Sequence, residues 1–146
     1  MEQQQTHSSI VIDSDIDTIM DVIADVEAYP EWISGIERVV LEEIYEEDER
    51  PASATFYASM SGMKGFYTVE YEWEDSEVTW DLTDGDFLKD LHGVYTCTPV
   101  DGGVEVDYGL EMVLSVPVVG ALRRRGEKVV VNSALKGLKR RVEEGS

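Results

Sequence analysis

The sequence predicts an α+β domain in which an antiparallel sheet packs against one long C-terminal helix. Three observations indicate it. Apolar and polar side chains alternate with a period of two through most of residues 36–115, and the turns between these runs are short. Residues 118–144 instead place apolar side chains at helical spacing. A length of 146 residues suits a single domain spanning 1–146.

The N-terminal region predicts one strand followed by a short helix. Thr6–Ile12 is typical of a strand, and the cluster Asp13-Ser14-Asp15 after it supplies side chains that cap a helix N-terminus. Apolar residues then recur near helical spacing, at Ile16, Ile19, Met20, Ile23 and Val26.

A second short helical segment is expected beyond that helix. Tyr29-Pro30 should end the first helix, because the residue before a proline is disfavoured in the α conformation. One more helical turn is expected over Glu31–Ser34, with Pro30 at its first position and Gly35 ending it.

Six further strands are expected in the middle of the chain. Turn sequences such as Asp75-Ser76, Asp84-Gly85-Asp86 and Asp101-Gly102-Gly103 separate them. Because these turns are short, neighbouring strands should run antiparallel as a meander. The expected strands cover residues 36–45, 54–60, 67–74, 78–83, 91–98 and 104–115.

A long helix is expected to follow Pro117. Its core stripe is Val131, Leu135, Leu138 and Val142, and residues 118–144 would span about 40 Å. One face of the preceding strands is apolar and aromatic, whereas the other is acidic. A single helix about 10 Å wide is narrow for such a face. The sheet and helix should therefore enclose either close side-chain packing or a cavity lined by Tyr, Trp and Met.

Charge limits the classes of partner. The chain holds 31 acidic and 12 basic residues, a net charge of −19, which disfavours nucleic acid and anionic membranes. The N-terminus lacks the basic and apolar regions of a secretory signal, and the apolar stretch Val113–Leu122 is too short to cross a bilayer. We therefore expect a cytoplasmic protein with no stable membrane insertion. A high-salt habitat would also favour this acidity.

The basic residues are concentrated at the C-terminal end. Residues 118–146 carry eight bases against three acids. The simpler interpretation is a helix with a basic edge packed on an acidic sheet. The alternative is that Arg123-Arg124-Arg125 contacts an anionic headgroup or an acidic protein partner.

Several stretches carry a resemblance to a known family. They are Val22–Ile33, with its Tyr-Pro-Glu-Trp junction, the pairs Tyr71-x-Trp73 and Val78-x-Trp80-x-Leu82, Gly93-x-Tyr95, and the closing Ala134–Glu143. With these stretches the chain resembles the START-like (helix-grip) superfamily, and within it the polyketide cyclase/dehydrase family and its coenzyme-Q-binding relatives. The resemblance implies a helix-grip fold, in which a curved seven-stranded antiparallel sheet wraps around the long C-terminal helix. Two short helices would lie between strands 1 and 2.

The resemblance also implies a hydrophobic tunnel between the sheet and the last helix. Its ligand would be a hydrophobic small molecule of the lipid, sterol, quinone or polyketide class. Trp32 and Met60 would lie near the entrance. The lining would comprise Tyr67, Tyr71, Trp73, Trp80, Tyr95, Tyr108, Met112, Leu135 and Leu138.

Three functions stay open at this point. The first is binding or carriage of such a ligand, and the second is a polyketide cyclase, aromatase or dehydratase. The third is a protein-interaction module whose aromatic side chains simply fill the core.

We expect no catalytic residue, metal or cofactor, because the inward strand positions hold no acid or base, and one cysteine cannot build a multi-cysteine site. The alternation turns His92 toward solvent and Cys97 inward, whereas Asp25, Glu27, Arg38 and Arg50 lie in segments that could still supply an inward charge.

Overall fold

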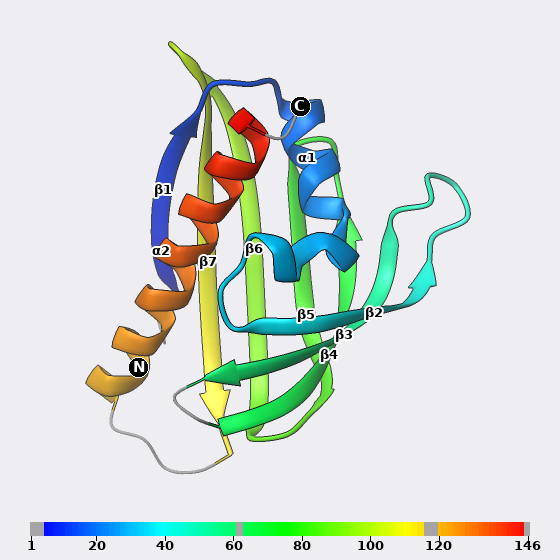
Figure 1. Cartoon of the computed structure of the whole chain (residues 1–146), viewed down its shortest axis with the longest axis vertical. Helices are drawn as coiled ribbons and strands as arrows, with labels where there is room; N and C mark the ends of the chain where they lie inside the picture. Colours follow the sequence, from blue (N-terminus) through cyan, green and yellow to red (C-terminus); the bar gives the residue numbers. More distant parts are fainter. Residues whose placement is uncertain (1–4, 61–62, 116–119, 145–146) are drawn as a thin grey trace.

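Seven antiparallel strands form one sheet that curves around the C-terminal helix α2 (Figure 1). The computed structural model describes residues 5–60, 63–115 and 120–144. The strands are β1 (Thr6–Ile12), β2 (Ile36–Ile44), β3 (Pro51–Met60), β4 (Met63–Trp73), β5 (Glu77–Gly85), β6 (Leu88–Val100) and β7 (Gly103–Leu114). The helices are α1 (Ile16–Ala24), the 3-10 helix η1 (Val26–Glu31) and α2 (Gly120–Glu144). The predicted fold class, including two short helices between the first two strands, is confirmed.

The order of strands in the sheet is β1-β7-β6-β5-β4-β3-β2. Strands β2 to β7 therefore form the expected meander, and β1 pairs with the last strand of that meander. The predicted start of the long helix at Pro117 lies outside the described residues. The stripe predicted for this helix is buried, with Val131, Leu135, Leu138 and Val142 all 5% exposed or less.

Helix α1 begins as its sequence indicates. The carboxylate of Asp15 accepts a hydrogen bond from the backbone N–H of Thr18 at 2.7 Å, and this bond lowers the pKa of Asp15. The three buried residues of α1, spaced to share one face, are Ile19, Met20 and Ile23.

The second helical segment lies earlier than expected. The turn predicted over Glu31–Ser34 is wrong, since η1 covers Val26–Glu31 and contains Pro30. Two features hold η1 at this position. Val26 and Tyr29 are buried in the core, and the Tyr29 hydroxyl donates a hydrogen bond to the carbonyl of Ile23. Tertiary packing thus moves the helical turn ahead of the place that the proline suggests.

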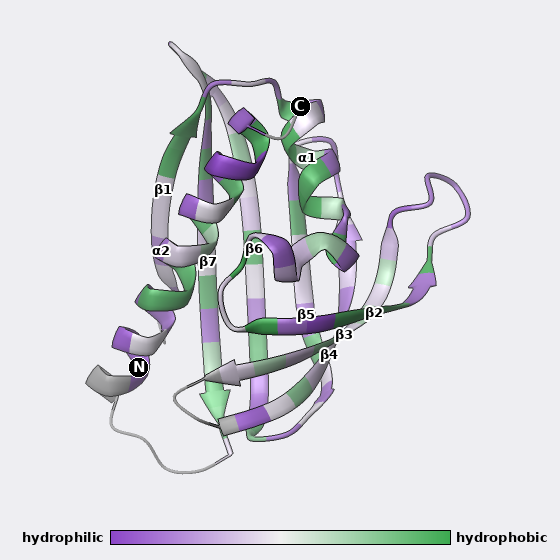
Figure 2. Cartoon of the chain, in the orientation of Figure 1, coloured by the Kyte–Doolittle hydropathy of each residue, from purple (hydrophilic) through white to green (hydrophobic). Residues whose placement is uncertain are grey.

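Helix α2 lies across the concave face of the sheet, alongside β1 and β7 (Figure 1). Its residues alternate between hydrophobic and hydrophilic along the ribbon, as Figure 2 shows. Gly137 packs directly against the backbone of Trp32, so that a Cβ at position 137 would overlap the Trp32 carbonyl oxygen. No helix among the described residues is long and apolar enough to cross a membrane.

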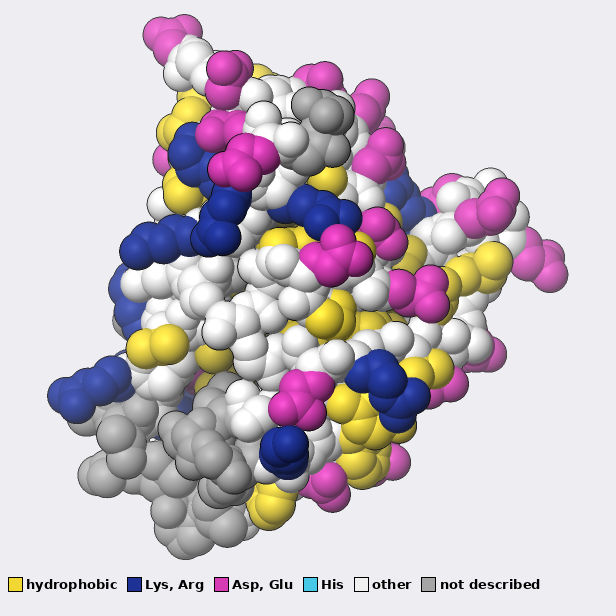
Figure 3. Space-filling model, viewed as in Figure 1, with side chains coloured by type: hydrophobic (Ala, Val, Ile, Leu, Met, Phe, Trp, Pro, Cys, Tyr) yellow, Lys and Arg dark blue, Asp and Glu magenta, His cyan; other side chains and the backbone are white. Residues whose placement is uncertain are grey.

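The surface charge follows the split expected from the sequence. Lys and Arg side chains gather over α2, whereas Asp and Glu side chains are scattered over much of the rest of the face in Figure 3. The exposed basic residues of α2 are Arg124, Arg125, Lys128, Lys136 and Arg140. A protein partner on this side of α2 stays a prediction.

Candidate functional site

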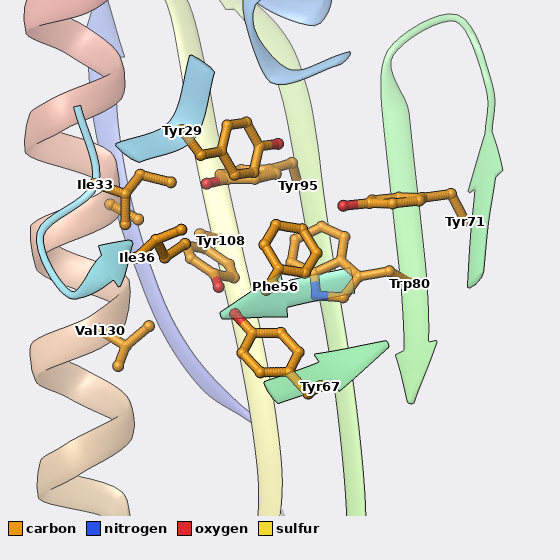
Figure 4. A pocket seen from close by; sticks show the side chains of 11 residues that line it. Tyr29, Ile33, Ile36, Phe56, Tyr67, Tyr71, Trp80, Tyr95, Tyr108 and Val130 are labelled. Carbon is orange, nitrogen blue, oxygen red and sulfur yellow. The ribbon is translucent and has the colours of Figure 1, made fainter. Parts of the chain in front are cut away.

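An aromatic pocket lies between the concave face of the sheet and α2 (Figure 4). Its volume is about 60 Å³. None of the described residues that line it carries a charge. The lining consists of Tyr29, Ile33, Ile36, Phe56, Tyr67, Tyr71, Trp80, Tyr95, Tyr108, Val130 and Ala134.

Strand register brings the aromatic rings of this pocket together. Tyr71 pairs with Trp80 across β4 and β5, and Tyr95 pairs with Tyr108 across β6 and β7. Trp80 pairs with Gly93, where a Cβ would overlap the indole ring, so the glycine leaves room for the tryptophan. Ring centroids of Tyr95 and Tyr108 lie 4.6 Å apart, and those of Trp80 and Tyr95 lie 5.4 Å apart. These spacings are typical of contacting aromatic pairs.

Four tyrosine hydroxyls in the pocket have no hydrogen-bond partner among the described residues. They belong to Tyr67, Tyr71, Tyr95 and Tyr108, whereas the hydroxyl of Tyr29 donates to the carbonyl of Ile23. In Figure 4 the hydroxyls of Tyr67 and Tyr71 point into the group of rings. These hydroxyls are accessible from the space inside the pocket, so an occupant that brings hydrogen-bond acceptors can pair with them.

Burial keeps these hydroxyls protonated. It raises the pKa of Tyr67 to about 12. Burial, followed by the neighbouring tyrosines, raises the pKa of Tyr71, Tyr95 and Tyr108 well above the ordinary value of 10.0. At neutral pH the pocket therefore offers neutral O–H donors on an apolar background.

The rings leave little free space. A cavity of about 60 Å³ holds a few water molecules. Small-molecule sites usually start at roughly 300 Å³. A ligand of ordinary size therefore requires movement of side chains that surround the pocket.

Five of the residues predicted to line a tunnel lie together in this pocket: Tyr67, Tyr71, Trp80, Tyr95 and Tyr108. Trp73 lies outside it, where its indole N–H donates to the carbonyl of Pro51 at 2.7 Å. The side chain of Met60 lies outside the described residues. The predicted residues that are buried in the core but do not line the pocket are Met112, Leu135 and Leu138.

Trp32 lines a second, outer space instead. This groove lies between α1, η1 and α2, has a volume of about 270 Å³, and is lined by Thr18, Asp21, Val22, Asp25, Trp32 and Arg141. The indole of Trp32 meets the ring of Tyr29, a pocket residue, edge-on at 4.9 Å. Its Nε1 is buried and has no hydrogen-bond partner among the described residues. Leaving such a donor unsatisfied costs about 1–3 kcal/mol.

Sequence reasoning missed several residues of the pocket. Tyr29, Ile33 and Ile36 come from the segment around η1, and Phe56 comes from β3. Phe56 lies on the inward face of its predicted strand, so the alternation could have identified it. Tyr29 carries no comparable pattern, because its position depends on how η1 folds back over the sheet.

Arg50, His92 and Cys97 do not line the pocket. Arg50 contacts Asp21 and the backbone of Met20, and His92 lies 2.8 Å from Asp81 on the outer side of the sheet. Burial raises the pKa of the Cys97 thiol to about 11, so it is inert at neutral pH. Within the part of the chain that the structure describes, no group of three potential metal ligands comes together.

Comparison with known proteins identifies the family. Residues 3–143 match the family described as polyketide cyclase / dehydrase and lipid transport. The chain therefore belongs to this family, whose description covers both enzymes acting on polyketides and proteins that carry lipids. No curated protein matches the sequence.

Solved structures show the same fold. A START superfamily protein from Mycobacterium smegmatis is 20% identical, with a TM-score of 0.89 over 99% of this chain and 100% of that chain. The Zhui aromatase/cyclase from Streptomyces sp. R1128 is 13% identical, with a TM-score of 0.73 over 98% of each chain. A STAR-related lipid transfer protein from Xanthomonas axonopodis is 15% identical, with a TM-score of 0.71 over 94% of this chain and 85% of that chain. These likenesses establish the START-like fold.

Proposed function

We propose that this protein binds and carries a neutral hydrophobic molecule of the lipid, quinone or polyketide class between the sheet and α2. The observation that carries the proposal is the set of four tyrosine hydroxyls that face an otherwise apolar pocket and have no hydrogen-bond partner among the described residues. A ligand with carbonyl or ether oxygens would accept hydrogen bonds from these hydroxyls, while its rings or chains pack against the aromatic side chains.

The uncharged lining favours binding over proton-transfer chemistry. A cyclase or dehydratase needs a group that gives and takes protons near neutral pH. Among the described residues that line the pocket, the titratable groups are tyrosines, and burial raises the pKa of each far above neutrality. Such hydroxyls can donate hydrogen bonds to a carbonyl, but they do not ionise at neutral pH.

Flavone is a suitable probe, because it is neutral, planar and carries a ketone oxygen. Its binding can be followed by quenching of tryptophan fluorescence, since Trp80 lines the pocket. We expect saturable quenching with one site per chain. Absence of quenching by flavone, together with the absence of any bound molecule in native mass spectra of the purified protein, would contradict the proposal.

Two adjacent positions on α2 give a matched pair of variants. Val130 lines the pocket, whereas Val129 is 64% exposed on the outer side of the helix. Val130→Phe adds a ring to a space that has little room, so we expect flavone binding to weaken by about tenfold or more. Val129→Phe should leave it unchanged. Equal effects of the two substitutions would place flavone outside the pocket.

A further inference from the structure

The pocket and the outer groove share a wall. Tyr29 lines the pocket and Trp32 lines the groove. The two rings are in contact, with their centroids 4.9 Å apart. The inner space of about 60 Å³ is too small for a ligand of ordinary size, whereas the groove outside it measures about 270 Å³. Together the two spaces exceed the roughly 300 Å³ at which small-molecule sites begin.

The side chain that forms this wall is unusual in its hydrogen bonding. The indole Nε1 of Trp32 is buried and has no partner among the described residues. The closed position therefore carries a penalty that an outward rotation would relieve, because the N–H would then meet water or a ligand oxygen. The side chain thus has a physical reason to populate a second position.

The backbone beneath this side chain is held firmly. The carbonyl of Trp32 packs against Gly137 of α2, and Arg141 of α2 bonds to the carboxylate of Glu31 at 2.8 Å. The backbone N–H groups of Trp32 and Ile33 both donate to the carbonyl of Tyr29, at 3.0 and 2.7 Å. Rotation of the indole would therefore open the groove toward the Tyr29 ring, which lines the pocket, while η1 and α2 stay in contact.

We infer that the groove between α1, η1 and α2 is the antechamber of the tyrosine pocket, and that the Trp32 side chain is the gate between them. This inference rests on the proposed function. A gate alters how fast a ligand enters and leaves. It changes the dissociation constant much less, because the rates in both directions respond together.

The experiment measures association and dissociation rates of flavone by stopped-flow quenching of the remaining tryptophans. Trp32→Phe removes the N–H and shrinks the ring while keeping an aromatic core, and Trp32→Ala removes the gate. We expect both rates to rise by about tenfold for Trp32→Ala and by a smaller factor for Trp32→Phe. The dissociation constant should stay within about threefold of the wild-type value.

A variant at the groove keeps the test independent of the packing of Trp32. Thr18 is exposed and lines the groove, whereas its neighbour Asp17 is exposed and does not line it. Thr18→Phe should slow both rates by about tenfold, and Asp17→Phe should leave them unchanged. The turn between β5 and β6 lies toward the opposite end of the sheet from α1 (Figure 1). Phe87 belongs to this turn, so Phe87→Ala reports on entry from that end.

The outcomes separate the two proposals. If the wild type binds flavone but the Trp32 and Thr18 variants keep wild-type rates, the gate is wrong and the proposed function stands. A change in rates with Phe87→Ala alone would place the entrance at the other end of the sheet. If the wild type does not bind, the proposed function fails and the inference falls with it.

Discussion

The carboxylate of Glu127 accepts a hydrogen bond from the backbone N–H of Met112 at 2.8 Å, although one residue belongs to α2 and the other to β7. Strand β1 begins at Thr6, opposite Leu110, so Met112 lies past the first residue of its strand neighbour. The carbonyl of Met112 is also bonded to α2, because the guanidinium of Arg123 donates to it at 2.9 Å. Side chains of the helix thus take the place of a strand partner.

Loss of this carboxylate should destabilise the protein. Glu127 is 1% exposed and also accepts a hydrogen bond from Thr6 at 2.6 Å. Glu127→Leu would remove the acceptor of the Met112 N–H and of the Thr6 hydroxyl. It would also remove the carboxylate that lies 3.6 Å from the Arg123 guanidinium, at a total cost of about 3–5 kcal/mol. Chemical denaturation measures the change, and Glu144→Gln on the exposed end of the same helix is the control. A loss below about 1 kcal/mol for Glu127→Leu would contradict this account.

Two glycines should respond in opposite directions to substitution by alanine. A Cβ at Gly93 would overlap the Trp80 ring, whereas a Cβ at Gly126 of α2 meets nothing within 4 Å. We expect Gly93→Ala to lower the free energy of unfolding by about 1–3 kcal/mol through overpacking. Gly126→Ala should raise it by about 0.5–1 kcal/mol, because alanine favours helix. Thermal unfolding followed by circular dichroism checks both, and destabilisation by both alanines would show that the overlap with Trp80 is not the cause.

The tyrosine cluster makes the fold sensitive to alkali. Burial raises the pKa of Tyr67 from 10.0 to about 12 in the folded state. Above about pH 10 the unfolded chain therefore releases protons that the folded chain retains. The contribution of Tyr67 to the free energy of unfolding should thus be constant below about pH 10 and should fall as the pH rises from 10 toward 12.

Denaturant titrations at a series of pH values test this, with tyrosinate absorbance as a second readout. Tyr67→Phe should make the decline shallower, because one such group is removed. A decline that starts well below pH 10, or that Tyr67→Phe leaves unchanged, would contradict the assignment.

Single hydroxyls of the pocket should contribute to the affinity for a ketone. Tyr71→Phe, Tyr95→Phe and Tyr108→Phe each remove one donor while the ring stays in place. Flavone should bind about two- to tenfold more weakly where the hydroxyl meets its oxygen, which corresponds to about 0.5–1.5 kcal/mol. 2-Phenylnaphthalene, which has a similar shape but no oxygen, should not lose affinity. Equal losses for both probes would indicate a change of packing rather than a lost hydrogen bond.

Much of the fold follows from local pattern. Alternation of apolar and polar residues assigned the strands, and the spacing of Val131, Leu135, Leu138 and Val142 assigned the buried side of α2. The alternation of apolar and polar residues does not set the register of the strands. Trp80 lies opposite Gly93, for example, where the absence of a Cβ leaves room for the indole ring. Burial of Tyr29 likewise decided the position of η1 against the preference of Pro30.

The pocket was predictable where it is built on strands. Tyr67, Tyr71, Trp80, Tyr95 and Tyr108 follow from the inward phase of four strands. Its closed side was not predictable, because η1 and α2 contribute residues through tertiary packing. The small volume also depends on how closely the rings pack, which no spacing in the sequence records.

The most direct test of the central claim is nuclear magnetic resonance of the protein with ring-labelled tyrosine, titrated with flavone. Five of the seven tyrosines line the pocket, and Tyr45 and Tyr57 lie outside it as internal references. The account predicts that the resonances of Tyr67, Tyr71, Tyr95 and Tyr108 shift together and saturate with one dissociation constant, while Tyr45 and Tyr57 stay in place. Shifts confined to Tyr45 and Tyr57, or no shifts at saturating flavone, would contradict it.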